Sequence, residues 1–107
     1  MMYFEECSGV YVVTDAELVP IYVGMSVSRV GVVSRGTKSQ AVRGGHHLFT
    51  SKVAPQLCEA VEHRLIALYV DAGVRLLNTS AGVLDYDGMV EAKPVARAIL
   101  EWVEEYG

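Results

Sequence analysis

Two short apolar runs near the start of the chain, each with a tyrosine and a glycine, constrain its fold most strongly. Gly9–Val13 has the sequence Gly-Val-Tyr-Val-Val, and Ile21–Gly24 has the sequence Ile-Tyr-Val-Gly. β-branched and aromatic residues favour strands. The segment between them, Thr14–Pro20, contains two acidic residues and a proline, which cannot donate to a sheet ladder. We therefore predict a β-hairpin formed by these two runs.

Length and composition predict one globular domain spanning residues 1–107. Half of the residues are hydrophobic, enough for a modest core without a disulfide or structural metal. No run approaches the roughly 20 apolar residues that span a bilayer, and the amino terminus lacks the basic region of a signal peptide, so we expect a cytoplasmic protein with no membrane partner. Cys7 and Cys58 fit no metal or redox motif, and we expect plain thiols.

The charged residues are unevenly distributed. The net charge of −4 argues against a nonspecific nucleic-acid coat protein. No acidic residue lies between Glu17 and Glu59, and the acids gather toward the end of the chain. The window between them contains the basic residues Arg29, Arg35, Lys38, Arg43 and Lys52, together with His46 and His47. We expect a phosphate-bearing substrate to contact the middle of the chain, with weak overall affinity from so few cations; a chance fluctuation of surface charge is the alternative.

The later segments predict further elements of a small α+β domain. Gly36–Gly45 is polar and glycine-rich, which suits a mobile loop over a substrate groove. His46–Val53 is expected to form a third strand. Apolar residues recur at three- and four-residue steps over Gln56–Ala72, which predicts an amphipathic helix that ends at Gly73.

The last part of the chain predicts a short extended piece and a final helix. Val74–Asn78 is expected to re-enter the core, followed by a turn-rich connection from Thr79 to Gly88. Pro94 then opens a helix with one apolar and one charged face. The expected architecture is a three-stranded, mainly antiparallel sheet packed with helices.

Three motifs, in order, resemble those of the GIY-YIG nuclease family. Gly9-Val10-Tyr11 and, about ten residues later, Tyr22-Val23-Gly24 resemble its name motif, with valine for isoleucine in both halves. Glu62, followed by Leu65-Ile66, resembles the family's metal-binding glutamate, and Leu76-Leu77-Asn78 resembles its terminal leucine and asparagine. Together these motifs cover Gly9 to Asn78, most of the chain.

The resemblance implies a metal-dependent endonuclease that hydrolyses DNA phosphodiester bonds by water attack. Glu62 would be the ligand of Mg²⁺ or Mn²⁺, because a helical turn would place it at the edge of the apolar face, aimed at the hairpin. Mg²⁺ suits a single carboxylate, since it keeps most of its waters and takes other oxygens from phosphate. Glu59, one turn earlier, could compete for this role.

The same resemblance assigns roles to residues around the hairpin. Tyr11 and Tyr22 are expected to lie side by side and to organise the attacking water and the phosphate, with Tyr11 as the base; a tyrosine pKa of about 10 would have to be lowered for that role. Asn78 would hold local backbone or a tyrosine, and His46 is a candidate for a proton relay. Gly24 is expected to border the substrate.

The main departure of this sequence from the family pattern is at the position of the family's arginine. Propensity alone favours a strand after Gly24, but the resemblance places a helix there through about Arg35, and the family's arginine position falls on Val32. Arg29 and Arg35 lie one turn to either side, and we favour Arg35 because it borders the glycine-rich segment. The remaining candidate phosphate-binding residues are Lys38 and Arg43.

Other functions stay open at this point. The chain has no obvious DNA-binding appendage, so specificity would come from a homo-oligomer, a partner protein or DNA structure. Val32 at the arginine position and the acidic last quarter suggest, as an alternative, a catalytically weakened domain that binds nucleic acid or a protein. A small α+β interaction domain without a nucleic-acid role is the third interpretation.

Overall fold

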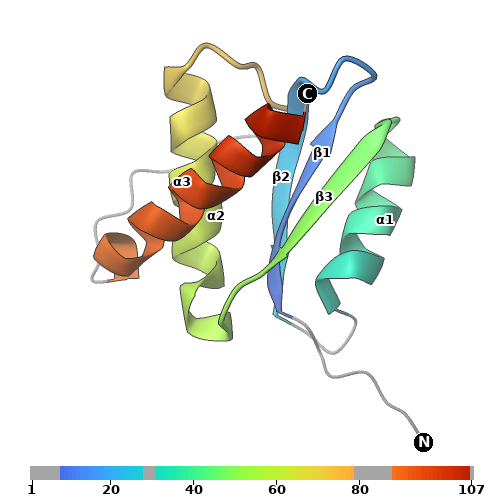
Figure 1. The fold of residues 1–107 in the computed structure, drawn as a ribbon. Helices are drawn as coiled ribbons and strands as arrows, with labels where there is room; N and C mark the ends of the chain where they lie inside the picture. The colour runs from blue at the N-terminus through green and yellow to red at the C-terminus, as the bar shows by residue number, and fades with distance from the viewer. Residues whose placement is uncertain (1–7, 28–30, 79–87, 107) are drawn as a thin grey trace, which may run out of the picture.

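The computed structural model describes residues 8–27, 31–78 and 88–106 and confirms the α+β class (Figure 1). Its sheet has the strands β1 (Gly9–Thr14), β2 (Pro20–Ser26) and β3 (His47–Lys52) in the order β2-β1-β3. Both neighbouring pairs are antiparallel. The predicted hairpin and third strand are therefore correct, and β2 and β3 are the two edge strands.

The turn of the hairpin lies in the predicted connecting segment Thr14–Pro20 and is built around Asp15. One carboxylate oxygen of Asp15 accepts hydrogen bonds from the N–H groups of Glu17 and Val19, each at 2.9 Å. Leu18 adopts a φ of 67°, a left-handed conformation that is uncommon outside glycine. The register shifts between Val13 and Thr14, so that Val13 faces Tyr22 and Thr14 faces Pro20.

Helices cover both faces of the sheet. Figure 1 shows α1 (Gly31–Arg43) on one face, with α2 (Pro55–Asp71) and α3 (Gly88–Tyr106) on the other. Because side chains alternate along a strand, β1 contributes to two cores. Val10 and Val12 join the larger cluster with α2 and α3, whereas Tyr11 and Val13 pack beneath α1.

The predicted mobile loop Gly36–Gly45 is wrong, because most of this segment belongs to α1. Gly36 is buried in the helix, where a Cβ would lie 2.9 Å from Cδ1 of Leu48 and 3.3 Å from Cγ of Tyr11. The glycine therefore allows α1 to approach the sheet closely. The helix predicted after Gly24 through about Arg35 begins later, at Gly31, and extends to Arg43, because β2 continues to Ser26.

The other two helices agree with the sequence to different degrees. α2 has Pro55 at its first position and ends where expected: Gly73 has a φ of 88°, and the N–H of Val74 donates to the Tyr69 carbonyl at 2.9 Å. The predicted start of the final helix at Pro94 is wrong, since α3 begins at Gly88 and Pro94 lies inside it.

The segment Val74–Asn78 runs beside the outer edge of β2, as an extended piece would. The N–H of Leu77 donates to the carbonyl of Ile21 at 2.6 Å. The connection predicted over Thr79–Gly88 lies almost wholly outside the described residues, as do Cys7 and Arg29. Within the described ranges, no helix is long and apolar enough to cross a bilayer.

Candidate active site

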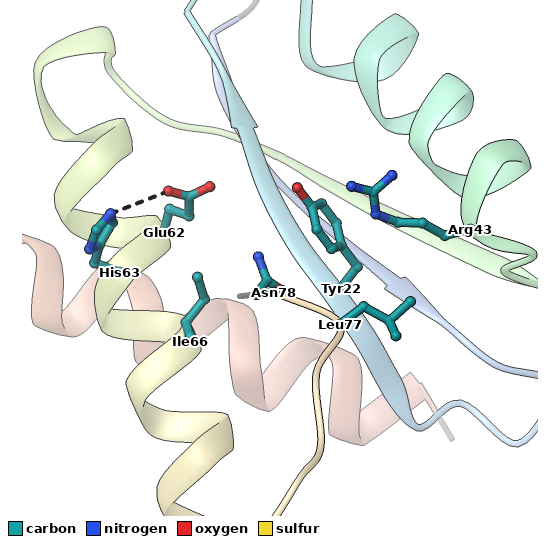
Figure 2. Close-up of a pocket in the computed structure, with 7 residues that line it drawn as sticks. All are labelled: Tyr22, Arg43, Glu62, His63, Ile66, Leu77 and Asn78. Atoms are coloured by element: carbon teal, nitrogen blue, oxygen red, sulfur yellow. Dashed lines mark ion pairs between the residues drawn. The ribbon is translucent and has the colours of Figure 1, made fainter. Parts of the chain in front are cut away.

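A polar pocket of about 260 Å³ opens beside the outer edge of β2. Its walls come from β2, the end of α1, one face of α2 and the segment that follows α2 (Figure 2). The lining residues are Tyr22, Arg43, Glu62, His63, Ile66, Leu77 and Asn78. Residues distant in the sequence, including five from the motifs described above, therefore meet in one place.

The two tyrosines of the motif are neighbours on a diagonal of the hairpin. In the register, Tyr11 faces Gly24 and Val13 faces Tyr22, so both aromatic side chains lie on the face that packs against α1. Their ring centroids are 6.3 Å apart, with an angle of 32° between the planes. Tyr22 lines the pocket, whereas Tyr11 is only 5% exposed and lies behind it.

Gly24 makes room for Tyr11. A Cβ at position 24 would overlap Cζ and the hydroxyl oxygen of Tyr11, because the ring of Tyr11 lies across the glycine. The glycine of the second motif therefore has a steric role in β2. Any larger side chain here would displace the ring that supports Tyr22.

Glu62 is the carboxylate of the pocket, and its charge is poorly solvated. Its side chain is 18% exposed, and its Oε1 lies 3.6 Å from Nε2 of His63. Burial, with a further contribution from the negative charge of Glu59, raises the pKa of Glu62 from 4.5 to about 7. Glu59 is itself exposed and does not line the pocket. A cation would relieve the cost of ionising Glu62 in this place.

The side chain of Asn78 connects the segment that follows α2 to β2 by hydrogen bonds. Its amide nitrogen donates to the carbonyl of Val23 at 2.7 Å, and its amide oxygen accepts from the N–H of Val23 at 2.9 Å. The side chain thus imitates a paired strand residue at the open edge of β2. Both polar ends of the amide are used, so Asn78 holds backbone, one of the two roles expected for it.

Arg43 enters the pocket from the last turn of α1. Its guanidinium carbon lies 3.8 Å from the centroid of the Tyr22 ring. Figure 2 shows the guanidinium near the hydroxyl end of Tyr22, with Glu62 on the other side of that ring in this view. A cation, an aromatic hydroxyl and a carboxylate therefore border the same polar space.

Other residues predicted for the site lie elsewhere. Arg35, Lys38 and His46 are exposed and do not line the pocket. Val32, at the position of the family's arginine, is 2% exposed and packs with Tyr11 and Val13. It therefore faces the core rather than a groove.

Three lining residues had no role in the sequence-based prediction. His63 follows Glu62 directly, and its Nδ1 is buried with no hydrogen-bond partner in the described part of the chain. Ile66 and Leu77 supply apolar walls. The helical spacing of Glu62 and Ile66 could have indicated a shared face, but nothing in the sequence places His63 inside a pocket.

The pocket suits a cation held by one carboxylate. Among the described residues, no group of three or more His, Cys, Asp or Glu side chains could hold a metal ion. Mg²⁺ does not need such a cage, because it commonly binds through one or two carboxylates and retains several waters. Glu62, partly buried in a polar pocket, fits this donor set, whereas Asn78 is occupied by Val23.

Comparison of the chain with family models, curated proteins and solved structures found no match.

Proposed function

We propose that this protein is a metal-dependent endonuclease that hydrolyses DNA phosphodiester bonds by water attack. The observation that supports it most is the shared pocket of Tyr22, Glu62 and Asn78, which lie on three separate segments of the chain. These are residues that the resemblance to the GIY-YIG family singles out. A set of unrelated surface residues would have no reason to converge.

Glu62, Tyr22 and Tyr11 would have different roles in the proposed reaction. Glu62 would hold Mg²⁺ or Mn²⁺, which supplies positive charge to the phosphate and increases the acidity of a bound water. The Tyr22 hydroxyl, at the pocket surface, would orient the attacking water and the phosphate. Tyr11 would support the Tyr22 ring, since the two ring centroids are 6.3 Å apart. Its hydroxyl lies over Gly24 and Tyr11 does not line the pocket, so the role of base does not fit it and the proton of the attacking water would pass to solvent.

A second candidate function is a nucleic-acid-binding or protein-binding domain with weakened catalysis. The burial of Val32, where the family has an arginine, favours it, because that position cannot present a cation to phosphate. In this case the pocket would bind nucleic acid without cutting it. The domain would still require Tyr22 and Asn78 for its shape.

Conversion of supercoiled plasmid into nicked and linear forms tests the main proposal. We expect cleavage with Mg²⁺ or Mn²⁺ and none in a chelator. Glu62→Gln should abolish it, because the amide keeps the shape of the side chain and removes the charge that holds the metal. Glu59→Gln is the matched control, since Glu59 lies one turn away and outside the pocket. No metal-dependent cleavage by the parent protein would favour the binding domain.

The proposal extends to the location and partners of the protein. We place the protein in the cytoplasm, where it would meet DNA. Target selection would depend on a second copy, a partner protein or a distortion of the DNA, because the cations of the domain are few.

A further inference from the structure

We infer that Arg43, at the end of α1, supplies the guanidinium that contacts the phosphate in the pocket. This inference rests on the proposed function and names a residue for it. The family's arginine position, Val32, is buried, and the exposed Arg35 does not line the pocket. Arg43 is the one arginine among its lining residues, counted over the described chain.

The Arg43 guanidinium is free to bind an anion. It stacks over the Tyr22 ring, and within the described residues no carboxylate forms an ion pair with it. A stacked guanidinium uses its face for the ring and keeps its N–H donors in its own plane. Those donors form a fork that matches two oxygens of one phosphate. Arg43 is also only partly exposed, so a bound anion would be screened less by water than on an open surface.

The backbone around Arg43 is firmly positioned. The N–H of Gly45 donates to the Gln40 carbonyl at 2.9 Å, and that of Gly44 donates to Ala41 at 3.4 Å, with Gly44 at a φ of 70°. This is the Schellman arrangement that ends a helix, and it makes Arg43 the last helical residue. The N–H of His46 then donates to the Thr14 carbonyl at 2.8 Å, which ties the helix end to β1.

The helix also places Arg43 on the correct side. Val32, Gly36, Ser39 and Arg43 follow steps of three and four residues, and the first three are buried against the sheet. Arg43 therefore continues the sheet-facing stripe to the point where it reaches the open edge of the core. A cation in the last turn of a helix is also favoured by the helix dipole.

The test compares Arg43→Ala with Arg35→Ala, which removes the same charge from an exposed position of the same helix. In the plasmid assay we expect Arg43→Ala to lower kcat by at least ~10²-fold, the scale for loss of one transition-state charge donor. Arg35→Ala should stay within a few-fold. Arg43→Lys should recover only part of the loss, because a point charge replaces the fork. Added guanidinium ion should partly restore cleavage by the Arg43→Ala variant but not by the Glu62→Gln variant.

A binding measurement makes the inference testable in the absence of cleavage. A labelled DNA duplex is titrated in the Glu62→Gln background, with and without Arg43→Ala, at several salt concentrations. Loss of one phosphate contact should reduce the slope of log affinity against log salt by about 1, and Arg35→Ala should change it less.

The outcomes separate the two proposals. Cleavage by the parent protein that Arg43→Ala and Arg35→Ala reduce equally would overturn the role of Arg43 and leave the endonuclease intact. No cleavage, but a salt slope lowered specifically by Arg43→Ala, would overturn the endonuclease and leave the phosphate contact. If the parent protein does not cleave DNA and Arg43→Ala leaves the salt slope unchanged, both the endonuclease and the phosphate contact would be overturned. Thermal unfolding must show that the Arg43→Ala variant is folded.

Discussion

The side-chain amide of Asn78 forms two hydrogen bonds with the backbone of Val23, at the edge of β2 that no other strand pairs with. Both hydrogen bonds are short, and they join residues 55 positions apart. The contact lies at the boundary between the pocket and the strand, so pocket geometry and strand stability depend on the same side chain.

Replacing Asn78 should therefore weaken the fold locally. We expect Asn78→Ala to lower the free energy of unfolding by about 1–3 kcal/mol, because two buried or partly buried backbone groups lose their partner. Asn78→Asp should lower the free energy of unfolding at least as much, since a carboxylate cannot donate to the Val23 carbonyl. Hydrogen exchange would locate the effect: the Val23 amide should lose protection first. Arg75→Ala, an exposed change in the same segment, should stay within ~0.5 kcal/mol.

Glu62→Gln should stabilise the protein in the absence of metal at alkaline pH. The pKa of Glu62 is raised from 4.5 to about 7 by burial, so the folded state binds more protons than the unfolded state between these values. Stability contributed by the protonated group is complete below the unfolded pKa and is lost as pH rises through the folded pKa. At about 1.4 kcal/mol per pH unit, the interval between the two pKa values sets an upper limit of about 3 kcal/mol on the gain in free energy of unfolding from Glu62→Gln.

The measurement is urea unfolding of parent and variant in a chelator. The two curves should nearly coincide at about pH 4 and diverge by about pH 8, with the variant more stable. Added Mg²⁺ should stabilise the parent more at the higher pH, where Glu62 is ionised, and should not stabilise Glu62→Gln. A parent protein that becomes more stable than the variant between these pH values in chelator would contradict the assigned environment of Glu62.

Gly24→Ala should destabilise the protein through Tyr11. The added methyl group would overlap the buried Tyr11 ring, and such overpacking costs about 1–3 kcal/mol. In a Tyr11→Ala background the same change should be neutral or stabilising, because alanine is favoured over glycine in a strand interior by about 0.5–1 kcal/mol. A double-mutant cycle by thermal unfolding measures this coupling. Equal costs of Gly24→Ala in both backgrounds would show that the Tyr11 ring is not the obstacle.

Introducing an arginine at position 32 should not supply a cation to the proposed active site. Val32 is 2% exposed beside Tyr11, so Val32→Arg would bury an unpaired cation and cost about 3 kcal/mol or more. The neighbouring Val33 is 58% exposed, and Val33→Arg should stay within ~0.5 kcal/mol. Thermal unfolding distinguishes the two variants. A well-folded Val32→Arg protein with increased cleavage would mean that this part of α1 faces the substrate.

The elements that the sequence predicted well are those with local signals. β-branched residues around Tyr11 and Tyr22, together with the acidic residues and proline of Thr14–Pro20, were enough for the hairpin. The apolar spacing of α2 and its end at Gly73 were equally direct. Tyr22, Glu62 and Asn78 were chosen by resemblance, and the structure brings them into one pocket.

The elements that were missed depend on tertiary packing. Gly36 looked like a loop residue, but its lack of a side chain serves close packing of α1 against Leu48. With Gly36–Gly45 predicted as a loop, the sequence defines no helical face for Arg43, and the prediction favours Arg35 because it borders this segment. Pro94 looked like a helix start, yet α3 begins at Gly88.

The contacts of Leu77 and Asn78 with β2 also protect the molecule from its neighbours. An uncovered edge strand offers unpaired N–H and C=O groups to other chains, and it is a common starting point for aggregation. In this protein the segment that completes the pocket occupies those groups at Ile21 and Val23. Substitutions that detach this segment would therefore reduce solubility as well as the proposed activity.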